Sequence, residues 1–180
     1  MHCKSTKIYQ KNDMAEGKTV TYEGIMRDLK ARKFAPIYYL MGDESYYIDK
    51  IADYIAENVL QPEERDLNQT VLYGADVTAA EIVDTAKRYP MMSEYQVVIV
   101  KEAQNLKNTD AFEQYLQKPL NSTVLVVCHK NGSVDKRKKL PGLVDKVGVL
   151  FESKKVKERD LPSFIENYLK SKGASIDPKS

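Results

Sequence analysis

The sequence predicts an α/β fold, an open three-layer sandwich in which helices cover both faces of a mostly parallel sheet of about five strands. Two apolar runs, residues 97–100 and 124–127, are rich in valine and contain no alternating polar residues. Strands buried on both faces have this pattern, which is typical of central strands in a parallel sheet. Between the runs, Phe112, Tyr115 and Leu116 are spaced as one face of a helix, as a crossover between parallel strands requires.

Three shorter apolar segments complete the predicted sheet, at residues 36–40, 68–73 and 149–151. Apolar side chains at intervals of three and four residues predict helices before and between these strands. The predicted order is one helix, about four strand–helix units, a last strand and a final helix. Such alternation of strands and helices is typical of a parallel α/β sandwich.

Individual residues predict where several helices begin and end. Thr78 and Glu81 have the spacing of a capping box, in which each side chain bonds the backbone amide of the other residue. Pro90 is expected to end the helix that follows this box, because proline lacks the amide that continues a helix. For the same reason, Pro141 and Gly142 are expected to interrupt a short helix before the last strand.

The length of 180 residues suits one domain and part of a second. We expect a disordered polar leader at residues 1–18, an α/β domain at residues 19–158, and a helix at residues 159–180 that begins another domain. No apolar run approaches the ~20 residues that span a bilayer, which excludes a membrane-spanning protein.

Charge and cysteine content narrow the class of protein further. The net charge of +2 is too small to indicate a nucleic-acid-binding domain, which is usually strongly basic. Cys3 lies in the polar leader and Cys128 in an apolar run, so they do not form a disulfide framework. Cys128 is predicted to be a buried core residue, and the pair together favour the reducing cytoplasm.

A ligand site in this kind of sheet lies beyond the carboxyl ends of the strands, usually after the first strand. Here residues 36–40 are followed by Gly42, Asp43 and Glu44. The G-x-x-x-x-G-K-[ST] loop that holds phosphates is missing, G-x-G-x-x-G is missing too, and two carboxylates would repel phosphates. The acidic pair that holds magnesium in related ATPases is reduced to Glu102, which we interpret as a solvated loop residue. No nucleotide or other cofactor is expected.

No catalytic or metal-binding set is recognisable. His2 and His129 have no cysteine cluster or spaced carboxylates around them, so a zinc site is not expected. Asp43 and Glu44 are interpreted as turn and N-cap residues, with acid–base catalysis as the alternative. The chain is therefore expected to have no catalytic residues.

Two basic clusters are interpreted as solvated surface charge, with contact to nucleic-acid phosphates as the alternative. The first cluster is a consecutive run, so its side chains are expected to point around a helix and not along one face. The second flanks the end of the predicted α/β domain. The candidate phosphate contacts are Lys136, Arg137, Lys138 and Lys139 in the first cluster and Lys154, Lys155, Lys157 and Arg159 in the second.

Met91 and Met92 occupy an unusual place for apolar side chains. They follow Pro90, which cannot continue a helix, and precede the central strand at residues 97–100. Methionine is flexible and polarizable, and it is common on binding surfaces. Two interpretations stay open: the methionines cover the end of the sheet as core, or they form a binding surface.

Four motifs together resemble the delta subunit family of bacterial DNA polymerase III. Residues 36–44 (PIYYLMGDE) resemble its opening strand and Gly-Asp/Glu turn. Residues 90–94 (PMMSE) and 97–101 (VVIVK) resemble its proline–hydrophobic–hydrophobic segment and the strand after it. Residues 135–139 (DKRKK) match its pattern after the fourth strand. The resemblance extends over residues 19–176, and the order and spacing of the motifs carry it.

The resemblance implies an AAA+-like domain with a degenerate P-loop NTPase site, in which partner subunits bind ATP and this chain does not. It implies that Met91 and Met92 insert into a pocket of the sliding clamp, the beta subunit, and that Pro90 shapes the segment presenting them. In the family this contact helps to open the ring for loading onto primed DNA. The family often has phenylalanine where Met92 stands, and arginines where Tyr95 and Gln96 stand.

The same resemblance implies that residues 159–180 are the first helix of a truncated helical lid domain. Other clamp-loader subunits would bind through a C-terminal domain missing from this chain, and DNA would be contacted in the full complex. The chain would be a non-catalytic component of the polymerase holoenzyme. The alternatives are a small α/β enzyme with an unrecognised nucleotide site and a nucleic-acid-binding module that uses the lysine clusters.

Overall fold

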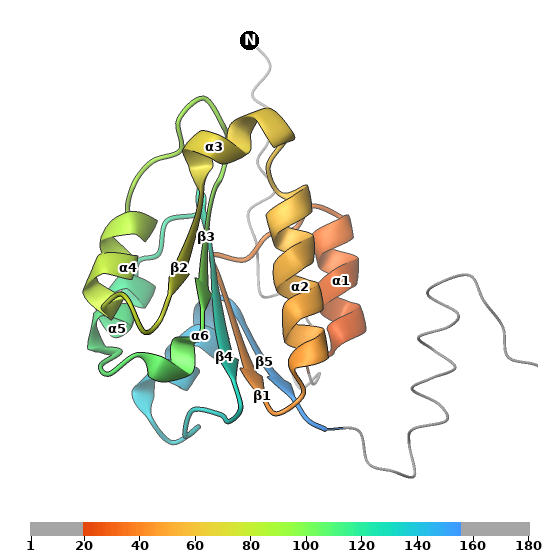
Figure 1. The fold of residues 1–180 in the computed structure, drawn as a ribbon. Coiled ribbons are helices and arrows are strands. Elements are labelled where there is room, and N and C mark those ends of the chain that lie inside the picture. Colours follow the sequence, from red (N-terminus) through yellow and green to blue (C-terminus); the bar gives the residue numbers. More distant parts are fainter. Residues whose placement is uncertain (1–19, 156–180) are drawn as a thin grey trace, which may run out of the picture.

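The computed structural model describes residues 20–155 (Figure 1). Within this range the chain forms one five-stranded sheet with helices on both faces, so the predicted three-layer α/β architecture is confirmed. The predicted leader at residues 1–18 and the predicted helix at residues 159–180 lie outside the described residues.

The sheet is parallel throughout, with strand order β2-β3-β4-β1-β5. The two strands predicted from continuous valine-rich runs are β3 and β4, and they pair in the middle of the sheet. The first strand of the chain, β1, lies on the other side of β4. The strands are β1 (Ile37–Gly42), β2 (Gln69–Tyr73), β3 (Gln96–Lys101), β4 (Thr123–Lys130) and β5 (Val149–Ser153).

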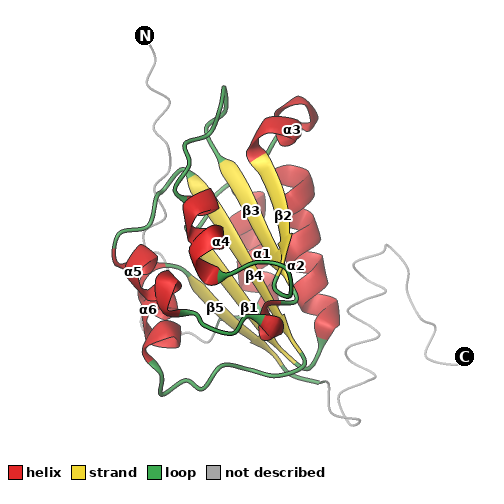
Figure 2. Ribbon diagram, turned by 60° about the vertical axis from the view of Figure 1, so that its left-hand side comes forward, coloured by secondary structure: helices red, strands yellow, loops and turns green. Residues whose placement is uncertain are grey.

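Helices divide between the two faces of the sheet, as Figure 2 shows. Helices α1 and α2 cover one face, and α4, α5 and α6 cover the other. Within the described range no helix has both the length and the apolar character needed to cross a membrane. The helices are α1 (Tyr22–Lys30), α2 (Ser45–Asn58), α3 (Arg65–Asn68), α4 (Ala79–Ala86), α5 (Asp110–Gln117) and α6 (Lys139–Val147), with short 3₁₀ turns at Pro62–Glu64 and Ala103–Asn105.

Each face of the sheet has its own apolar core. Along β1, Tyr38 and Leu40 point into the core beneath α1 and α2, whereas Tyr39 and Met41 point into the core beneath α4, α5 and α6. Every residue of β1 is buried, which explains why its sequence has no polar alternation. Cys128 of β4 is also buried, as predicted, and burial raises the pKa of its thiol to about 12.

Capping side chains mark the starts of α1 and α4. The Thr21 hydroxyl accepts a hydrogen bond from the Gly24 amide, and the Thr78–Glu81 capping box forms as predicted. The expected interruption at Pro141 and Gly142 is wrong, because α6 runs through both residues. Pro141 is the third residue of α6, where a backbone amide has no partner inside the helix and its loss costs little.

Replacement of Thr78 by alanine is expected to lower the free energy of unfolding by about 1 kcal/mol. The substitution removes the acceptor of the Glu81 amide, 3.2 Å from the Thr78 hydroxyl, and breaks the capping box. Chemical denaturation of the two proteins measures the difference. Asp84→Ala is the control, since it changes an exposed residue of the same helix; an equal loss there would contradict the capping role.

Candidate functional site

The carboxyl edge of the sheet, where α/β proteins bind phosphates, is closed by backbone contacts after β1. The Gly42 amide donates to the carbonyl of Gly132 at 2.8 Å, and the Asn131 amide donates to the carbonyl of Gly42 at 3.1 Å. Gly42 has a φ of 127°, and a Cβ built there would lie 2.0 Å from the carbonyl oxygen of Ser153. Neighbouring backbone therefore fills the space around the turn that a phosphate-binding loop would need.

The amino end of α2 already has an anionic partner from the protein itself. The Glu44 carboxylate accepts a hydrogen bond from the Tyr46 amide at 3.1 Å, which confirms Glu44 as an N-cap residue. In phosphate-binding proteins the amides at such a helix start face the anion. Here a carboxylate occupies this position, so a phosphate would meet both a missing donor and a negative charge.

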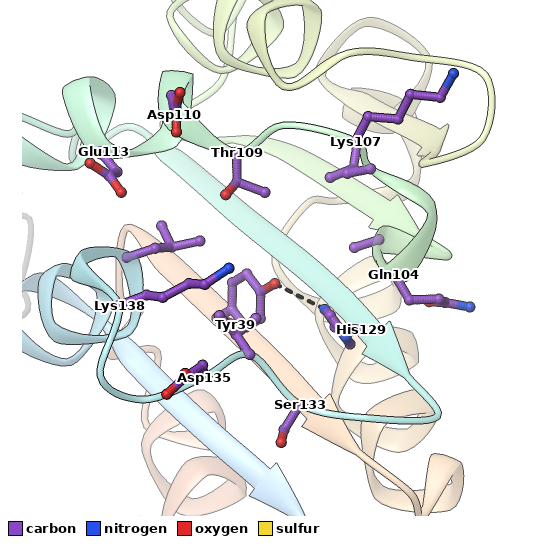
Figure 3. Close-up of a pocket in the computed structure, with 14 residues that line it drawn as sticks. Tyr39, Gln104, Lys107, Thr109, Asp110, Glu113, His129, Ser133, Asp135 and Lys138 are labelled. Atoms are coloured by element: carbon purple, nitrogen blue, oxygen red, sulfur yellow. Dashed lines mark hydrogen bonds between the residues drawn. The ribbon is translucent and has the colours of Figure 1, made fainter.

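A cavity of about 490 Å³ lies at the same edge, between the ends of β1 and β4 and the start of α5 (Figure 3). The Tyr39 hydroxyl and His129 Nδ1 are 3.1 Å apart in its wall. Burial lowers the pKa of His129 and raises that of Tyr39, which favours the neutral form of each. Lys107 and Asp110 contribute opposite charges to the lining, so the cavity does not gather groups of one sign.

The residues considered for catalysis or metal binding stay apart. Glu102 is exposed with a left-handed φ of 55°, in agreement with its interpretation as a loop residue. No group of three or more His, Cys, Asp or Glu side chains comes together over residues 20–155. His2 lies outside the described residues. The structure therefore brings no predicted chemistry together at the carboxyl edge.

Acidic side chains accompany most of the consecutive basic run. Lys136 pairs with Glu152 at 2.5 Å, and Lys139 pairs with Glu113 at 3.7 Å. Arg137 pairs with its near neighbour Asp135 at 3.0 Å, which lowers the pKa of that carboxyl. Only Lys139 belongs to α6, so the expectation that the run opens this helix is wrong for the other three residues.

The methionines lie at the opposite edge of the sheet, in residues 87–95 between α4 and β3, which we call the methionine segment (Figure 1). Met91 is 60% exposed and Met92 is 96% exposed. The interpretation of Met91 and Met92 as core residues is therefore wrong, because both side chains are mostly exposed. A methionine surrounded by water contributes little to folding, and its apolar surface is free to contact another molecule.

Helix α4 ends at Ala86, before Pro90, so the predicted role of this proline in stopping the helix is wrong. Side chains from the sheet donate hydrogen bonds to the last backbone carbonyls of α4, which have no amide partners within the helix. The Gln96 side-chain amide donates to the carbonyl of Thr85 at 2.7 Å, and the Thr123 hydroxyl donates to the carbonyl of Ala86 at 2.6 Å. These buried bonds fix the point at which the methionine segment leaves α4.

A buried asparagine from α3 holds the middle of the methionine segment. Asn68 is 3% exposed, and its side-chain oxygen accepts from the Met91 amide at 2.6 Å. Its side-chain nitrogen donates to the carbonyls of Met91 at 2.9 Å and Glu64 at 3.0 Å.

Beyond Met91, Met92 adopts a left-handed φ of 55°, which is uncommon for a residue with a side chain.

The far end of the methionine segment is anchored through Tyr95. The Tyr95 ring meets the Phe34 ring edge-on at a centroid distance of 5.2 Å, and the Tyr95 amide donates to the Ser93 hydroxyl at 3.3 Å.

Sequence reasoning identified Met91 and Met92 but missed Asn68, which it placed in a strand. The partner of Asn68 is 23 residues away, and no local pattern signals such a contact.

Further exposed apolar side chains lie next to the methionines. Leu67, in α3 beside Asn68, is 62% exposed, and Tyr89 is 75% exposed. The hydrogen bonds of Asn68 to Met91 join α3 to the methionine segment, and these two joined elements carry four large exposed apolar side chains. Exposed apolar side chains in such a cluster are typical of a surface that binds a protein.

Together, the fold and its two edges define a parallel α/β module with a filled turn after β1 and an apolar surface at the other end of the sheet. Residues 38–158 match the family described as DNA polymerase III, delta subunit. This match covers more than half of the chain, and the chain belongs to that family.

A similar sequence and a similar solved structure, both from Bacillus subtilis, agree with this assignment. The DNA polymerase III subunit delta of Bacillus subtilis strain 168 is 27% identical over 162 residues, which are 84% of this chain and 47% of that protein. The solved structure of the Bacillus subtilis DNA clamp loader delta protein (YqeN) superimposes with a TM-score of 0.75 at 26% identity, covering 87% of this chain and 49% of that one. The chain thus spans about half the length of the relatives it matches.

Proposed function

We propose that this chain is the part of a clamp-loader delta subunit that binds the DNA sliding clamp and helps to open the ring for loading onto primed DNA. The observation that carries the proposal is the exposure of Met91 and Met92 at one end of a rigid sheet. Two adjacent apolar side chains presented this way fit an apolar pocket on a protein partner. Pro90 restricts the backbone just before them.

The proposed role contains no catalytic step and no nucleotide bound by this chain. In support, the Gly42 turn is filled by the carbonyl groups of Gly132 and Ser153, and the Glu44 carboxylate caps α2. ATP would act through other subunits of the loader, which would bind this protein through a C-terminal domain. The assembly would work on DNA in the cytoplasm.

We propose no DNA contact for the basic run, because carboxylates offset much of its positive charge. Three of its four side chains have carboxylate partners within 4 Å: Lys136, Arg137 and Lys139. Each pairing partly offsets the positive charge that would attract phosphates. The Lys138 side chain faces the cavity at the carboxyl edge (Figure 3).

Calorimetric titration of the chain into the sliding clamp of its own species tests the proposal. We expect saturable binding that persists at high salt, because apolar contacts are screened far less than ion pairs. The absence of binding at accessible protein concentrations would contradict the proposed function. Binding that vanishes on addition of salt would indicate a charge-based contact instead.

Titration of the chain with ATP and magnesium tests the nucleotide part. We expect no saturable binding at micromolar ATP, because backbone fills the space at the Gly42 turn and the Glu44 carboxylate occupies the Tyr46 amide at the start of α2. An intact P-loop ATPase measured in parallel serves as the control. Saturable micromolar binding would contradict the account of the carboxyl edge and favour the enzyme alternative.

A further inference from the structure

We propose that Asn68 is a positioning residue for clamp binding, which holds the methionine segment in its binding conformation before the clamp arrives. This inference rests on the proposed function, because it concerns the same surface. Asn68 contacts the backbone of Met91 from the buried side, opposite the exposed side chains. Asn68 would therefore affect the affinity for the clamp without contacting the clamp itself.

The hydrogen bonds of Asn68 match both polar groups of one residue. Its carboxamide accepts from the Met91 amide at 2.6 Å and donates to the Met91 carbonyl at 2.9 Å. The same nitrogen donates to the carbonyl of Glu64 at 3.0 Å, one turn back in the chain. A single side chain thus ties the methionine segment to α3, using both the acceptor oxygen and the donor nitrogen of its carboxamide.

Little else fixes the middle of the methionine segment. Gln96 and Thr123 act where the segment leaves α4, and Tyr95 packs where it enters β3. Between these ends, Met91 and Met92 are largely exposed, at 60% and 96%, so packing of their side chains contributes little to holding the backbone. Without the Asn68 bonds, the backbone here would sample many conformations, and ordering it on the clamp would weaken binding.

The left-handed backbone of Met92 makes this support more important. A φ of 55° is disfavoured for a residue with a Cβ, so the conformation persists only where neighbouring contacts impose it. The Asn68 bonds fix the peptide groups on both sides of the Met91 α-carbon, immediately before Met92. Their loss would let Met92 relax and change the direction of both methionine side chains.

Two variants test the inference in the whole chain. Asn68→Ala removes all three hydrogen bonds, and Asn68→Asp keeps the shape but replaces the donating nitrogen with an oxygen that faces two carbonyls. We expect each variant to bind the clamp about tenfold more weakly or worse, through loss of preorganisation. Amide hydrogen exchange of Met91 in the free variants is expected to be faster by a similar factor.

Ile55→Val is the matched control for stability. Ile55 is fully buried in the core beneath α1 and α2, so the change weakens the fold without removing any hydrogen bond of the methionine segment. We expect its clamp affinity and its Met91 exchange rate to match the wild type under conditions where all variants are folded. This control separates a positioning role from a general loss of stability.

The outcomes distinguish failure of this inference from failure of the proposed function. If the wild type binds the clamp and the Asn68 variants bind equally well, the inference alone is overturned. Weaker binding with unchanged Met91 exchange, or an equal loss in Ile55→Val, would also overturn it, because the effect would not pass through Met91. If the wild type itself does not bind, the proposed function fails and the inference falls with it.

Discussion

Replacement of both Met91 and Met92 by alanine is expected to weaken binding to the sliding clamp by roughly thirtyfold or more, the usual effect of truncating central interface residues. The two side chains are 60% and 96% exposed, so their apolar surface faces solvent and not the core. For the same reason, the free energy of unfolding is expected to change by less than about 0.5 kcal/mol. Calorimetry and chemical denaturation measure the two quantities.

The control is a second pair of exposed apolar residues, Val71 and Tyr73, on the edge strand β2. They are 42% and 44% exposed, and Tyr73 lies at the carboxyl end of the strand, away from the methionine segment. The double variant Val71→Ala/Tyr73→Ala is expected to bind the clamp as the wild type does. Equal losses in both double variants would show that binding follows overall apolar surface and not the methionines.

Replacement of Gly42 by alanine is expected to destabilise the domain by about 3 kcal/mol or more, because the backbone strain and the steric clash act together. A φ of 127° is rarely adopted by residues with a side chain. The new Cβ would also lie 2.0 Å from the carbonyl oxygen of Ser153, and backbone would have to move to relieve that contact. Thermal unfolding is expected to show a midpoint lower by roughly 10 °C.

Gly142→Ala is expected to have the opposite effect on stability from Gly42→Ala. A Cβ at Gly142, inside α6, would meet nothing within 4 Å. Alanine is the better helix former, so this variant is expected to be more stable by about 0.5–1 kcal/mol. If Gly42→Ala were as stable as the wild type, the turn after β1 would not be as tightly filled as described, and the argument against a phosphate site there would lose its basis.

Local sequence patterns predicted most of the fold. Continuous apolar runs predicted β3 and β4 because central strands must be apolar on both faces, and Thr78 with Glu81 marked the start of α4 because capping depends on neighbours in sequence. The interruption at Pro141 was wrong since the effect of proline depends on its position within a helix, and the start of α6 at Lys139 was not visible in the sequence.

The candidate site was only partly predictable. Met91 and Met92 stood out as an apolar pair after Pro90, yet sequence spacing could not show whether the pair lies in the core or on the surface. Exposure depends on what the rest of the chain places nearby. Asn68 and Gln96 act through hydrogen bonds to residues 23 and 11 positions away, and such pairs become visible only when the fold brings them together.

The most direct test of the central claim is nuclear magnetic resonance of the methionine methyl groups during titration with the sliding clamp. The chain has six methionines, which include half-buried Met26 in α1 and buried Met41 in β1 as internal references. We expect the Met91 and Met92 signals to shift or broaden as the clamp is added, beyond the general broadening seen at Met26 and Met41. Binding of the clamp with Met91 and Met92 no more affected than these references would contradict it.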